Sequence, residues 1–367
     1  MSWIKELSPP HIQELVPYAS AGRDPQKGEV WLNANENPYQ RSVEGMESSL
    51  NRYPEFQPQA LLEAYSDYAG CAPENLIVTR GIDEGIDLLL RAFGEPGRDA
   101  VVYTPPTYGM YSISAEALGL ELYPIPLKGD FQLDIDAFKG AYREDISRIS
   151  ISGSYPKLIF LCSPNNPTGN LLNRDDVLKV LELSKGISIV VVDEAYIEFA
   201  PESSFMDDII AYDNLVIART LSKGFGLAGL RTGFLAANPE IIQILRKVSA
   251  PYPIPVPVVD VVRNALIPDG IERMQEEVGN ITIARKVLAE ALSTLNYVEM
   301  IMPSEANFVL LRVTNAPELM DYLRAQGIII RDQSKQLLLE NCVRITLGTS
   351  FEMDRLLEAM KAYGDRT

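Results

Sequence analysis

The stretch "RTLSKGFGLAGLR" from Arg219 to Arg231 places a lysine among hydroxyls, glycines and a second arginine. Thr220 and Ser222 carry hydroxyls that can bind a phosphate, and the guanidinium of Arg231 adds a fork of donors. Lys223 beside such a cradle is either a phosphate ligand or a Schiff-base lysine that holds a phosphorylated aldehyde. Taken alone, Ser-Lys-Gly is a weak motif and favours a solvated lysine, so its interpretation depends on the neighbouring residues.

A second candidate, Asp193, ends the apolar run "IVVV", so its carboxylate is expected at the mouth of a sheet. A carboxylate in that position needs a cationic or hydrogen-bonding partner, and a protonated pyridine nitrogen is one such partner. Tyr196 offers a phenol three residues further on. An aspartate that caps the following helix explains Asp193 equally well.

Two further candidates follow other strand patterns. Asn166 in "SPNNPTG" can donate a hydrogen bond to a ligand oxygen, although Asn-Pro and Thr-Gly also mark an ordinary loop. Tyr108 in "PPTYGMY" begins a helix and can stack on a flat ring, although aromatic residues at helix starts more often serve packing.

A helix start in "RGIDEGIDLL" comes straight after a strand pattern. The free backbone N–H groups around Gly81, Ile82 and Asp83 can receive a phosphate. The alternative is an ordinary helix start, with Asp83 placed to complement the helix dipole.

Two arginines lie at or inside strand patterns near the C-terminus, Arg331 in "IIIRDQ" and Arg344 in "VRITLG". A charge among apolar neighbours needs a partner. A structural ion pair is a plausible partner for Arg331, and an anionic ligand is the other possibility.

The elements that position these residues are six short apolar runs, each followed by a helical or turn pattern. The runs cover residues 75–80, 99–103, 157–162, 187–193, 214–219 and 232–237. They are branched and apolar on both faces, as buried strands of a parallel sheet are. Alternation with helices predicts an α/β domain, whose ligands gather beyond the carboxyl ends of the strands. All the candidates described above, apart from Arg331 and Arg344, lie there.

The proline-rich stretch from Ala250 to Asp260 predicts a domain boundary, because prolines interrupt both helix and sheet. We expect an N-terminal arm and helix over residues 1–30, a large domain over 31–251 and a smaller α+β domain over 252–367. The small domain begins with a long helical pattern over 271–295 and continues with strand patterns in "NFVLLRV", "GIIIRD" and "CVRITLG".

Composition excludes several classes of protein. A net charge of −17 argues against nucleic acid or an anionic membrane as the main partner. We see no membrane-spanning run and no signal-peptide core, and the three scattered cysteines favour reduced thiols in the cytoplasm. His11 is the single histidine, so multi-histidine metal sites are excluded and no metal is expected.

The candidates occur together, and their order and spacing resemble the pyridoxal-phosphate-dependent aminotransferases of the aspartate aminotransferase fold type. The resemblance rests on "CSPNNPTG", "VVDEAYIEF" and "RTLSKGFGLAGLR". The terminal stretches "VWLNANENP" and "GIIIRDQSKQ" are similar to the subgroup that acts on histidinol phosphate. The resemblance implies a mostly parallel seven-stranded sheet flanked by helices, with a smaller α+β domain.

The resemblance also implies roles for individual residues. Lys223 would form the Schiff base with pyridoxal phosphate, and Asp193 would pair with the pyridine nitrogen. Tyr196 and Asn166 would hydrogen-bond the phenolic oxygen of the ring, and Tyr108 would stack on it. The phosphate would be held by Ile82, Asp83, Thr220, Ser222 and Arg231. Tyr53 would reach that phosphate from the other subunit, so a homodimer is implied.

The implied reaction is ping-pong transamination between L-histidinol phosphate and 2-oxoglutarate, which gives imidazole acetol phosphate and L-glutamate. Arg331, Arg344 and Tyr18 would grip the substrate phosphate or carboxylate, and Asn35 or Asn33 would line the imidazole end. Gly224 and Gly226 depart from the family pattern, in which we expect alanines.

Other functions are compatible with the same motifs. An aromatic or broad-specificity aminotransferase and a phosphoamino-acid decarboxylase would share the fold, and only the aminotransferases need a 2-oxo acid. A cofactor-binding regulator without turnover is a different class. Such a regulator usually carries an added DNA-binding domain, for which the sequence gives no sign.

Overall fold

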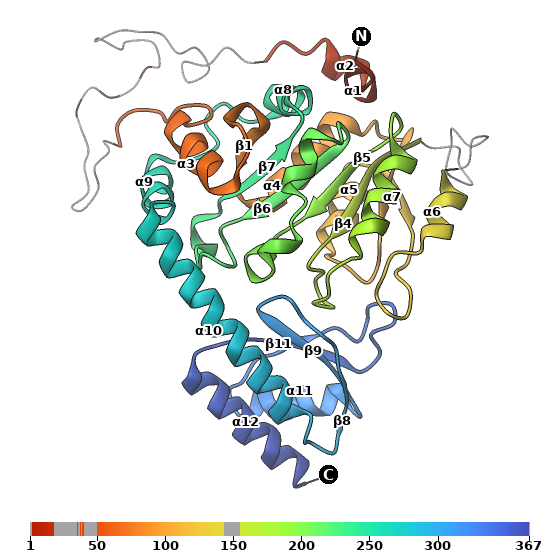
Figure 1. The fold of residues 1–367 in the computed structure, drawn as a ribbon, viewed down its shortest axis with the longest axis vertical. Helices are drawn as coiled ribbons and strands as arrows, with labels where there is room; N and C mark the ends of the chain where they lie inside the picture. The colour runs from red at the N-terminus through yellow and green to blue at the C-terminus, as the bar shows by residue number, and fades with distance from the viewer. Residues whose placement is uncertain are drawn as a thin grey trace.

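The computed structural model describes residues 2–17, 35, 37, 39, 50–142 and 155–366. Within these residues the strands form two sheets, one of seven strands and one of four. Figure 1 shows the larger sheet in the upper part of the molecule and the smaller sheet below it. The long helix α10 (Pro268–Leu292) runs between them.

The strand order across the large sheet is β1-β7-β6-β5-β4-β2-β3. The bounds are Leu76–Thr79 (β1), Asp99–Tyr103 (β2), Glu121–Pro124 (β3), Tyr155–Cys162 (β4), Ile189–Asp193 (β5), Leu215–Thr220 (β6) and Gly233–Ala237 (β7). Neighbours from β6 to β3 pair in parallel, whereas β7 is antiparallel to both β6 and β1. The predicted seven-stranded, mostly parallel sheet is therefore confirmed.

One strand of this sheet, β3, is absent from the six predicted apolar runs. Its residues "ELYP" are partly buried or exposed, because β3 lies at the edge of the sheet beside β2. Apolar periodicity reports burial, so an edge strand with a polar and a proline residue carries little of that signal.

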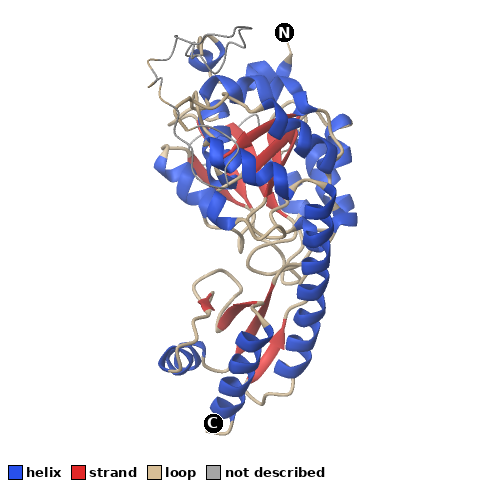
Figure 2. Cartoon of the chain, turned by 90° about the vertical axis from the view of Figure 1, so that its left-hand side faces the viewer, coloured by secondary structure: helices blue, strands red, loops and turns tan. Residues whose placement is uncertain are grey.

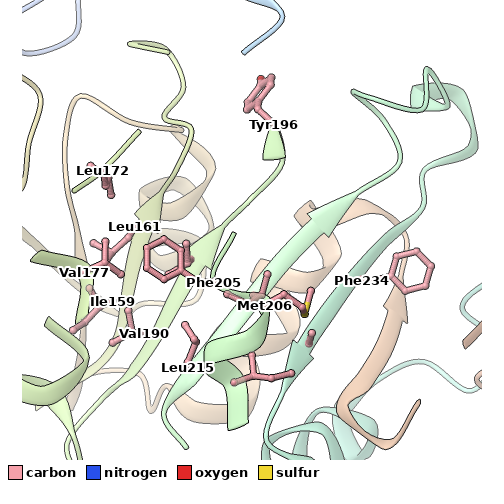
Figure 3. Packing of buried hydrophobic residues seen from close by; sticks show 14 of the residues in the cluster. Ile159, Leu161, Leu172, Val177, Val190, Tyr196, Phe205, Met206, Leu215 and Phe234 are labelled. Carbon is pink, nitrogen blue, oxygen red and sulfur yellow. The ribbon is translucent and has the colours of Figure 1, made fainter. Parts of the chain in front are cut away.

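Alternate side chains of the central strands enter two different cores. On β5, Val190 and Val192 face one core, and Ile189 and Val191 face the other. Figure 3 shows the first core, in which Val190 packs near side chains of β4 and β6. The first core is covered by α3 (Gln59–Ala69), α6 (Ile135–Ala141), α7 (Arg174–Ser184) and α9 (Val256–Ala265). The second is covered by α4 (Gly81–Phe93), α5 (Met110–Ala117) and α8 (Pro239–Val248).

Two short N-terminal helices, α1 (Trp3–Leu7) and α2 (Pro10–Gln13), dock on the second of these faces. The Ser8 hydroxyl donates to the Ala92 carbonyl at 2.8 Å, and the Lys247 ammonium donates to the Gln13 carbonyl at 2.7 Å. The predicted arm over residues 1–30 extends beyond the described residues 2–17 and stays a prediction.

The small sheet has the order β10-β11-β9-β8, and all its pairs are antiparallel. Its strands are Val298–Ile301 (β8), Phe308–Val313 (β9), Arg331–Asp332 (β10) and Cys342–Thr346 (β11). The helices α11 (Ala316–Ala325) and α12 (Ser350–Gly364) supply side chains to its core. The predicted strand in "GIIIRD" contracts to β10, and the partly exposed β8 was not predicted.

The linking helix α10 contributes to both cores. Met274 and Val278 in its first half belong to the core of the large sheet, and Leu288 and Leu292 in its second half belong to that of the small sheet. Figure 2 shows the helix running along the side of the molecule past both sheets. The division at residue 251 stays a prediction. Because the packing of α9 and α10 favours a later boundary, we propose one shortly after Val278.

Among the described helices, including α10, none has the length and apolarity that a membrane span requires.

Candidate active site

A pocket of about 110 Å³ opens at the carboxyl ends of the central strands. Its lining contains every predicted cofactor-binding residue except Tyr53. Cys162 and Ala195 also line it and were not predicted. The predicted residues are Ile82, Asp83, Tyr108, Asn166, Asp193, Tyr196, Thr220, Ser222, Lys223 and Arg231. Their assembly in one place is a fact of the fold, whereas their roles toward a cofactor stay predictions.

Strand register explains why the residues meet. Cys162 at the end of β4 lies opposite Asp193 at the end of β5, which in turn lies opposite Ala218 of β6. Asn166 and Lys223 follow β4 and β6 by a few residues. Parallel strands end at the same edge of a sheet, so the loops after β4, β5 and β6 converge there.

The Asp193 carboxylate is buried, with 3% of the residue exposed. One of its oxygens accepts a hydrogen bond from the Tyr111 hydroxyl at 2.6 Å, and the other accepts one from the Ala195 backbone N–H at 3.0 Å. Burial raises the pKa of Asp193 to about 6, although both hydrogen bonds act to lower it. The alternative role as a helix cap is not found, because the following helical turn, Ile197–Phe199, begins after Tyr196 and has no side-chain cap.

Sequence reasoning missed Tyr111, which is fully buried behind Asp193. Its ring stacks on Phe160 with centroids 4.8 Å apart and planes 8° apart, and the Tyr108 ring meets it edge-on at 5.6 Å. Helical spacing in "TYGMY" does not link the two tyrosines, because Tyr108 precedes α5, which begins at Met110. Without the fold, nothing indicated that Tyr111 meets the end of β5.

The first turn of α4 and Arg231 form a cradle for an anion. Arg231 donates to one oxygen of Asp83 at 2.8 Å, and the Tyr108 hydroxyl donates to the other at 2.9 Å. The ion pair is about half exposed, so it adds little stability and chiefly orients the guanidinium. The N–H groups of a first helical turn have no partner within the helix, so they are available to an anion here.

Glycines allow the close approach of chain segments at this cradle. Gly81 has a φ of +76°, and a Cβ atom there would come within 2.9 Å of the Arg231 guanidinium. Gly233 on β7 faces the backbone of Gly81 and Ile82, and a Cβ there would lie 2.8 Å from the carbonyl carbon of Gly81. A side chain at either position would therefore displace the helix start or the arginine.

The hydroxyls of Thr220 and Ser222 lie 2.9 Å apart, and the Ser222 N–H donates to the Thr220 hydroxyl at 3.1 Å. Thr220 in turn donates to the carbonyl of Thr232 at 3.1 Å. The two side chains therefore form a compact pair beside the first turn of α4, in the same pocket.

Lys223 is partly buried, so the interpretation as an ordinary surface lysine is wrong. Its ammonium lies 5.5 Å from the centroid of the Tyr196 ring. Burial lowers the pKa of Lys223, and the positive charge of Arg344 lowers it further against the opposing effect of Asp193. A lowered pKa makes the neutral amine more accessible, and the neutral amine is the form that attacks an aldehyde.

Gly224, where we expected alanine, touches a side chain from the loop after β5. A Cβ atom at this position would come within 2.6 Å of the Glu198 Cβ and Cγ atoms. Gly226 has a φ of +66°, which an alanine adopts only with strain. Both departures from the family pattern are therefore accommodated by the local packing and backbone.

Arg344 connects the small sheet to the pocket. Its guanidinium donates a hydrogen bond to the Asn166 side-chain oxygen and lies 5.1 Å from the centroid of the Phe308 ring. Its Nε is buried and has no hydrogen-bond partner among the described residues. Burial lowers the pKa of Arg344. Since a buried donor is costly to leave unpaired, this arginine is suited to receive an anionic ligand.

Arg331 lies directly opposite Arg344 in the pairing of β10 with β11. Two like charges at such positions repel each other. Neither arginine forms an ion pair with another described residue, so the predicted structural pair for Arg331 is not found there. Both line a cavity of about 700 Å³ on the small sheet.

Four further predicted residues lie outside the pocket or outside the described residues. Tyr53 is 57% exposed and stacks on Tyr252 with ring centroids 4.4 Å apart. Asn35 is exposed and has a φ of 55°. Tyr18 and Asn33 lie outside the described residues.

The sequence matches the family model described as aminotransferase class I and II over residues 24–360. The chain belongs to this family. An aminotransferase of Pectobacterium atrosepticum, named histidinol-phosphate aminotransferase, is 46% identical over 99% of this chain and 98% of its own length. A protein of Haemophilus influenzae named histidinol-phosphate aminotransferase 1 is 48% identical over 98% of this chain and 95% of its own length.

Solved structures share the fold of this aminotransferase. The histidinol-phosphate aminotransferase of Clostridium acetobutylicum superposes with a TM-score of 0.76 at 24% identity, over 87% of this chain and 92% of that one. The enzyme of the same name from Sinorhizobium meliloti, solved with pyridoxal 5'-phosphate, gives a TM-score of 0.71 at 24% identity, over 85% and 83% of the two chains.

The cofactor of this aminotransferase is pyridoxal phosphate, and the pocket residues fit it. Each oxygen of the buried Asp193 carboxylate keeps a lone pair beyond its one hydrogen bond, so a protonated pyridine ring can pair with it inside the pocket. The cradle of Arg231, Thr220 and Ser222 beside a helix N-terminus suits a phosphate. Lys223 lines the same pocket and supplies an amine that can hold an aldehyde.

Proposed function

We propose that this aminotransferase transfers the amino group of L-histidinol phosphate to 2-oxoglutarate, giving imidazole acetol phosphate and L-glutamate in histidine biosynthesis. The observation that carries the proposal is the pair of arginines beside the pocket, Arg331 and Arg344, without an acidic partner among the described residues. The relatives of 46% and 48% identity, which bear the name of this activity, support it.

Ten pocket residues would hold the cofactor. Asp193 would pair with the pyridine nitrogen, Tyr108 would cover the ring face, and Tyr196 and Asn166 would contact the phenolic oxygen. The phosphate would be bound by the backbone of Ile82 and Asp83 and the side chains of Thr220, Ser222 and Arg231. When bound, pyridoxal phosphate supplies an aldehyde that links to Lys223 or to a substrate amine, and a ring that withdraws electrons.

Lys223 is the proposed base and acid of the reaction. Once its Nζ is free, the neutral amine takes a proton from the substrate carbon that bears the nitrogen. The same Nζ would hold that proton and act as the acid that returns it. Burial and the charge of Arg344 favour the neutral form, which supports this role.

The arginine pair would bind the anionic end of each substrate. Histidinol phosphate has no carboxylate, so its phosphate would occupy the place where the carboxylate of glutamate binds in the other half-reaction. Arg344 offers a buried Nε without a partner among the described residues, and Arg331 adds a second guanidinium across the strand pair. Tyr18 and Asn35 stay predicted contributors to this end of the site.

We further propose a cytoplasmic homodimer in which Tyr53 of one subunit contacts the phosphate of the other. Tyr53 and Tyr252 form a stacked pair with an exposed tyrosine face, and Tyr53 does not line the pocket of its own chain. A contact across a subunit interface is compatible with both observations.

A single half-reaction tests the substrate. The purified protein carrying pyridoxal phosphate is mixed with L-histidinol phosphate without any 2-oxo acid, and the loss of absorbance from the lysine-linked cofactor is followed. L-Histidine, L-phenylalanine and L-aspartate are run alongside. We expect the fastest conversion, at the lowest concentration, with histidinol phosphate, and no conversion in Lys223→Ala.

The competing functions give different outcomes. Faster conversion with L-phenylalanine would assign an aromatic aminotransferase instead. Release of carbon dioxide from a phosphoamino acid without any 2-oxo acid would assign a decarboxylase. No spectral change with any amine would indicate a binding protein without turnover.

A further inference from the structure

The hydrogen bond between Tyr111 and Asp193 joins a buried phenol to the carboxylate at the end of β5. The oxygen–oxygen distance is 2.6 Å, and the tyrosine is fully buried. Tyr111 does not line the pocket, so Asp193 lies between the phenol and any bound cofactor. Any effect of Tyr111 on the cofactor must therefore pass through Asp193.

The geometry leaves Tyr111 little freedom. Its ring is stacked on Phe160 of β4 and meets Tyr108 edge-on, so the two rotatable side-chain bonds are fixed by packing. The hydroxyl then lies at one oxygen of Asp193 while the Ala195 N–H holds the other. Two donors on the two oxygens fix the plane of the carboxylate, and each oxygen keeps a further lone pair for a ligand.

We infer that Tyr111 is a positioning residue, which holds Asp193 oriented and ionised for the positively charged pyridine ring of the cofactor. The inference rests on the proposed function, because it assumes that Asp193 faces that ring. A phenol donates to the ionised form of a carboxylate, so the bond favours the charge that the pyridine needs. Removing the hydroxyl would leave a buried carboxylate oxygen without this donor.

The charges around Asp193 act in both directions. Asp193 faces Tyr111 from α5, Cys162 from β4, Asp83 from α4 and Lys223 from the loop after β6. Burial and the charge of Asp83 raise the pKa of Asp193, whereas the phenol, the Ala195 N–H and Lys223 lower it. Loss of the phenol therefore moves the protonation of Asp193 to higher pH.

The test uses Tyr111→Phe, with Tyr297→Phe as the matched control. Tyr297 is also buried and donates to a backbone carbonyl at 2.8 Å, but it lies in the small-sheet core. The dissociation constant of pyridoxal phosphate is measured by titrating the cofactor-free proteins between pH 5 and pH 8. We expect Tyr111→Phe to bind at least about tenfold more weakly at neutral pH, since a hydrogen bond to a charged group is lost. The pH below which binding weakens should also move upward, whereas Tyr297→Phe should match the wild type.

A double-mutant cycle with Asp193→Asn separates positioning from packing. If Tyr111 acts through the ionised Asp193, adding Tyr111→Phe to Asp193→Asn changes the dissociation constant little. If Tyr111→Phe alone does not fold, the dissociation constants of Asp193→Asn and of the double variant are still compared, because neither protein contains the unsatisfied carboxylate. Equal values support positioning through Asp193, and a weaker double variant contradicts it.

Different results of these titrations would contradict the role of Tyr111 and the placement of the cofactor. An unchanged pH dependence in Tyr111→Phe, or an equal loss of affinity in the Asp193→Asn background, overturns the inference and leaves the proposed function intact. If the wild-type protein binds pyridoxal phosphate no better than Asp193→Ala at any pH, the placement of the cofactor itself fails.

Discussion

At the scale of single residues, the site is built from groups that the fold holds in unfavourable states. Asp193 is a carboxylate in a buried place, and Lys223 is an amine whose pKa is lowered by burial. The Nε of Arg344 is a buried donor without a partner among the described residues. Burial costs each group free energy in the ligand-free protein. A ligand that supplies the missing charge or hydrogen-bond partner offsets this cost, so it binds more tightly.

Asp193 gives a measurable form of this effect in the cofactor-free protein. Its pKa is about 6 in the folded state and about 3.9 in an unfolded chain. Between these values the folded state holds more protons, so stability falls as the pH rises, and the loss is nearly complete by about pH 7. In Asp193→Asn this loss is absent. From pH 5 to pH 7.5 we therefore expect the wild type to lose about 1–2 kcal/mol more unfolding free energy than the variant.

Urea unfolding of the two cofactor-free proteins across this pH range measures the difference. Asp87→Asn on α4 serves as the control, since its side chain is partly exposed and paired with Arg91. Parallel pH profiles for wild type and Asp193→Asn would mean that burial does not perturb this carboxyl.

At the scale of elements, the proposed function gives the pairing of β10 with β11 a role in substrate specificity. The pairing places Arg331 opposite Arg344, although like charges in this position weaken a strand pair. Cross-strand repulsion of this kind is relieved by an anion between the two guanidinium groups. In the proposed function, the short β10 would place Arg331 opposite Arg344 for an anionic ligand.

Arg344→Ala tests this interpretation. We expect the KM values for L-histidinol phosphate and for 2-oxoglutarate both to rise at least about tenfold, since each loses a charged hydrogen bond. Steady-state kinetics with each substrate varied in turn gives the two values. The control is Arg312→Ala on the neighbouring β9, whose guanidinium donates to the carbonyls of Leu338 and Glu340. An effect confined to one substrate would contradict a shared anion site.

Most of this site could be predicted from sequence because strand ends are predictable. Asp193 closes a run of buried branched residues, and Lys223 follows the next run by a few positions. Tyr111 could not be predicted, because its role depends on how α5 packs against the end of β5. The edge strand β3 and the partly exposed β8 also lack the apolar pattern that marks buried strands.

At the scale of the whole molecule, the proposed homodimer would give Tyr53 a role. This residue lies outside its own pocket and presents an exposed ring stacked on Tyr252. A site completed by a neighbouring subunit is formed only after assembly, so turnover and dimerisation would be linked.

Subunit complementation tests that link. Tyr53→Ala and Lys223→Ala are each expected to have low activity, and their random mixture contains hybrid dimers. In a hybrid, one of the two sites combines an intact Lys223 with an intact Tyr53 from the partner. We expect about a quarter of the wild-type activity in the mixture, because about half of the dimers are hybrids with one complete site. A mixture no more active than its components would place Tyr53 outside the neighbouring site.

The long helix α10 packs in both cores and has a glycine in the stretch between them. The helix is anchored in the large core up to Val278 and in the small core from Leu288, and Gly279 follows the first anchor with open space around its Cα atom. Glycine is the least rigid residue in a helix interior. Gly279 therefore gives α10 its least rigid turn in the stretch between its two groups of core side chains. A change in the angle between the two sheets would distort the helix least at this turn.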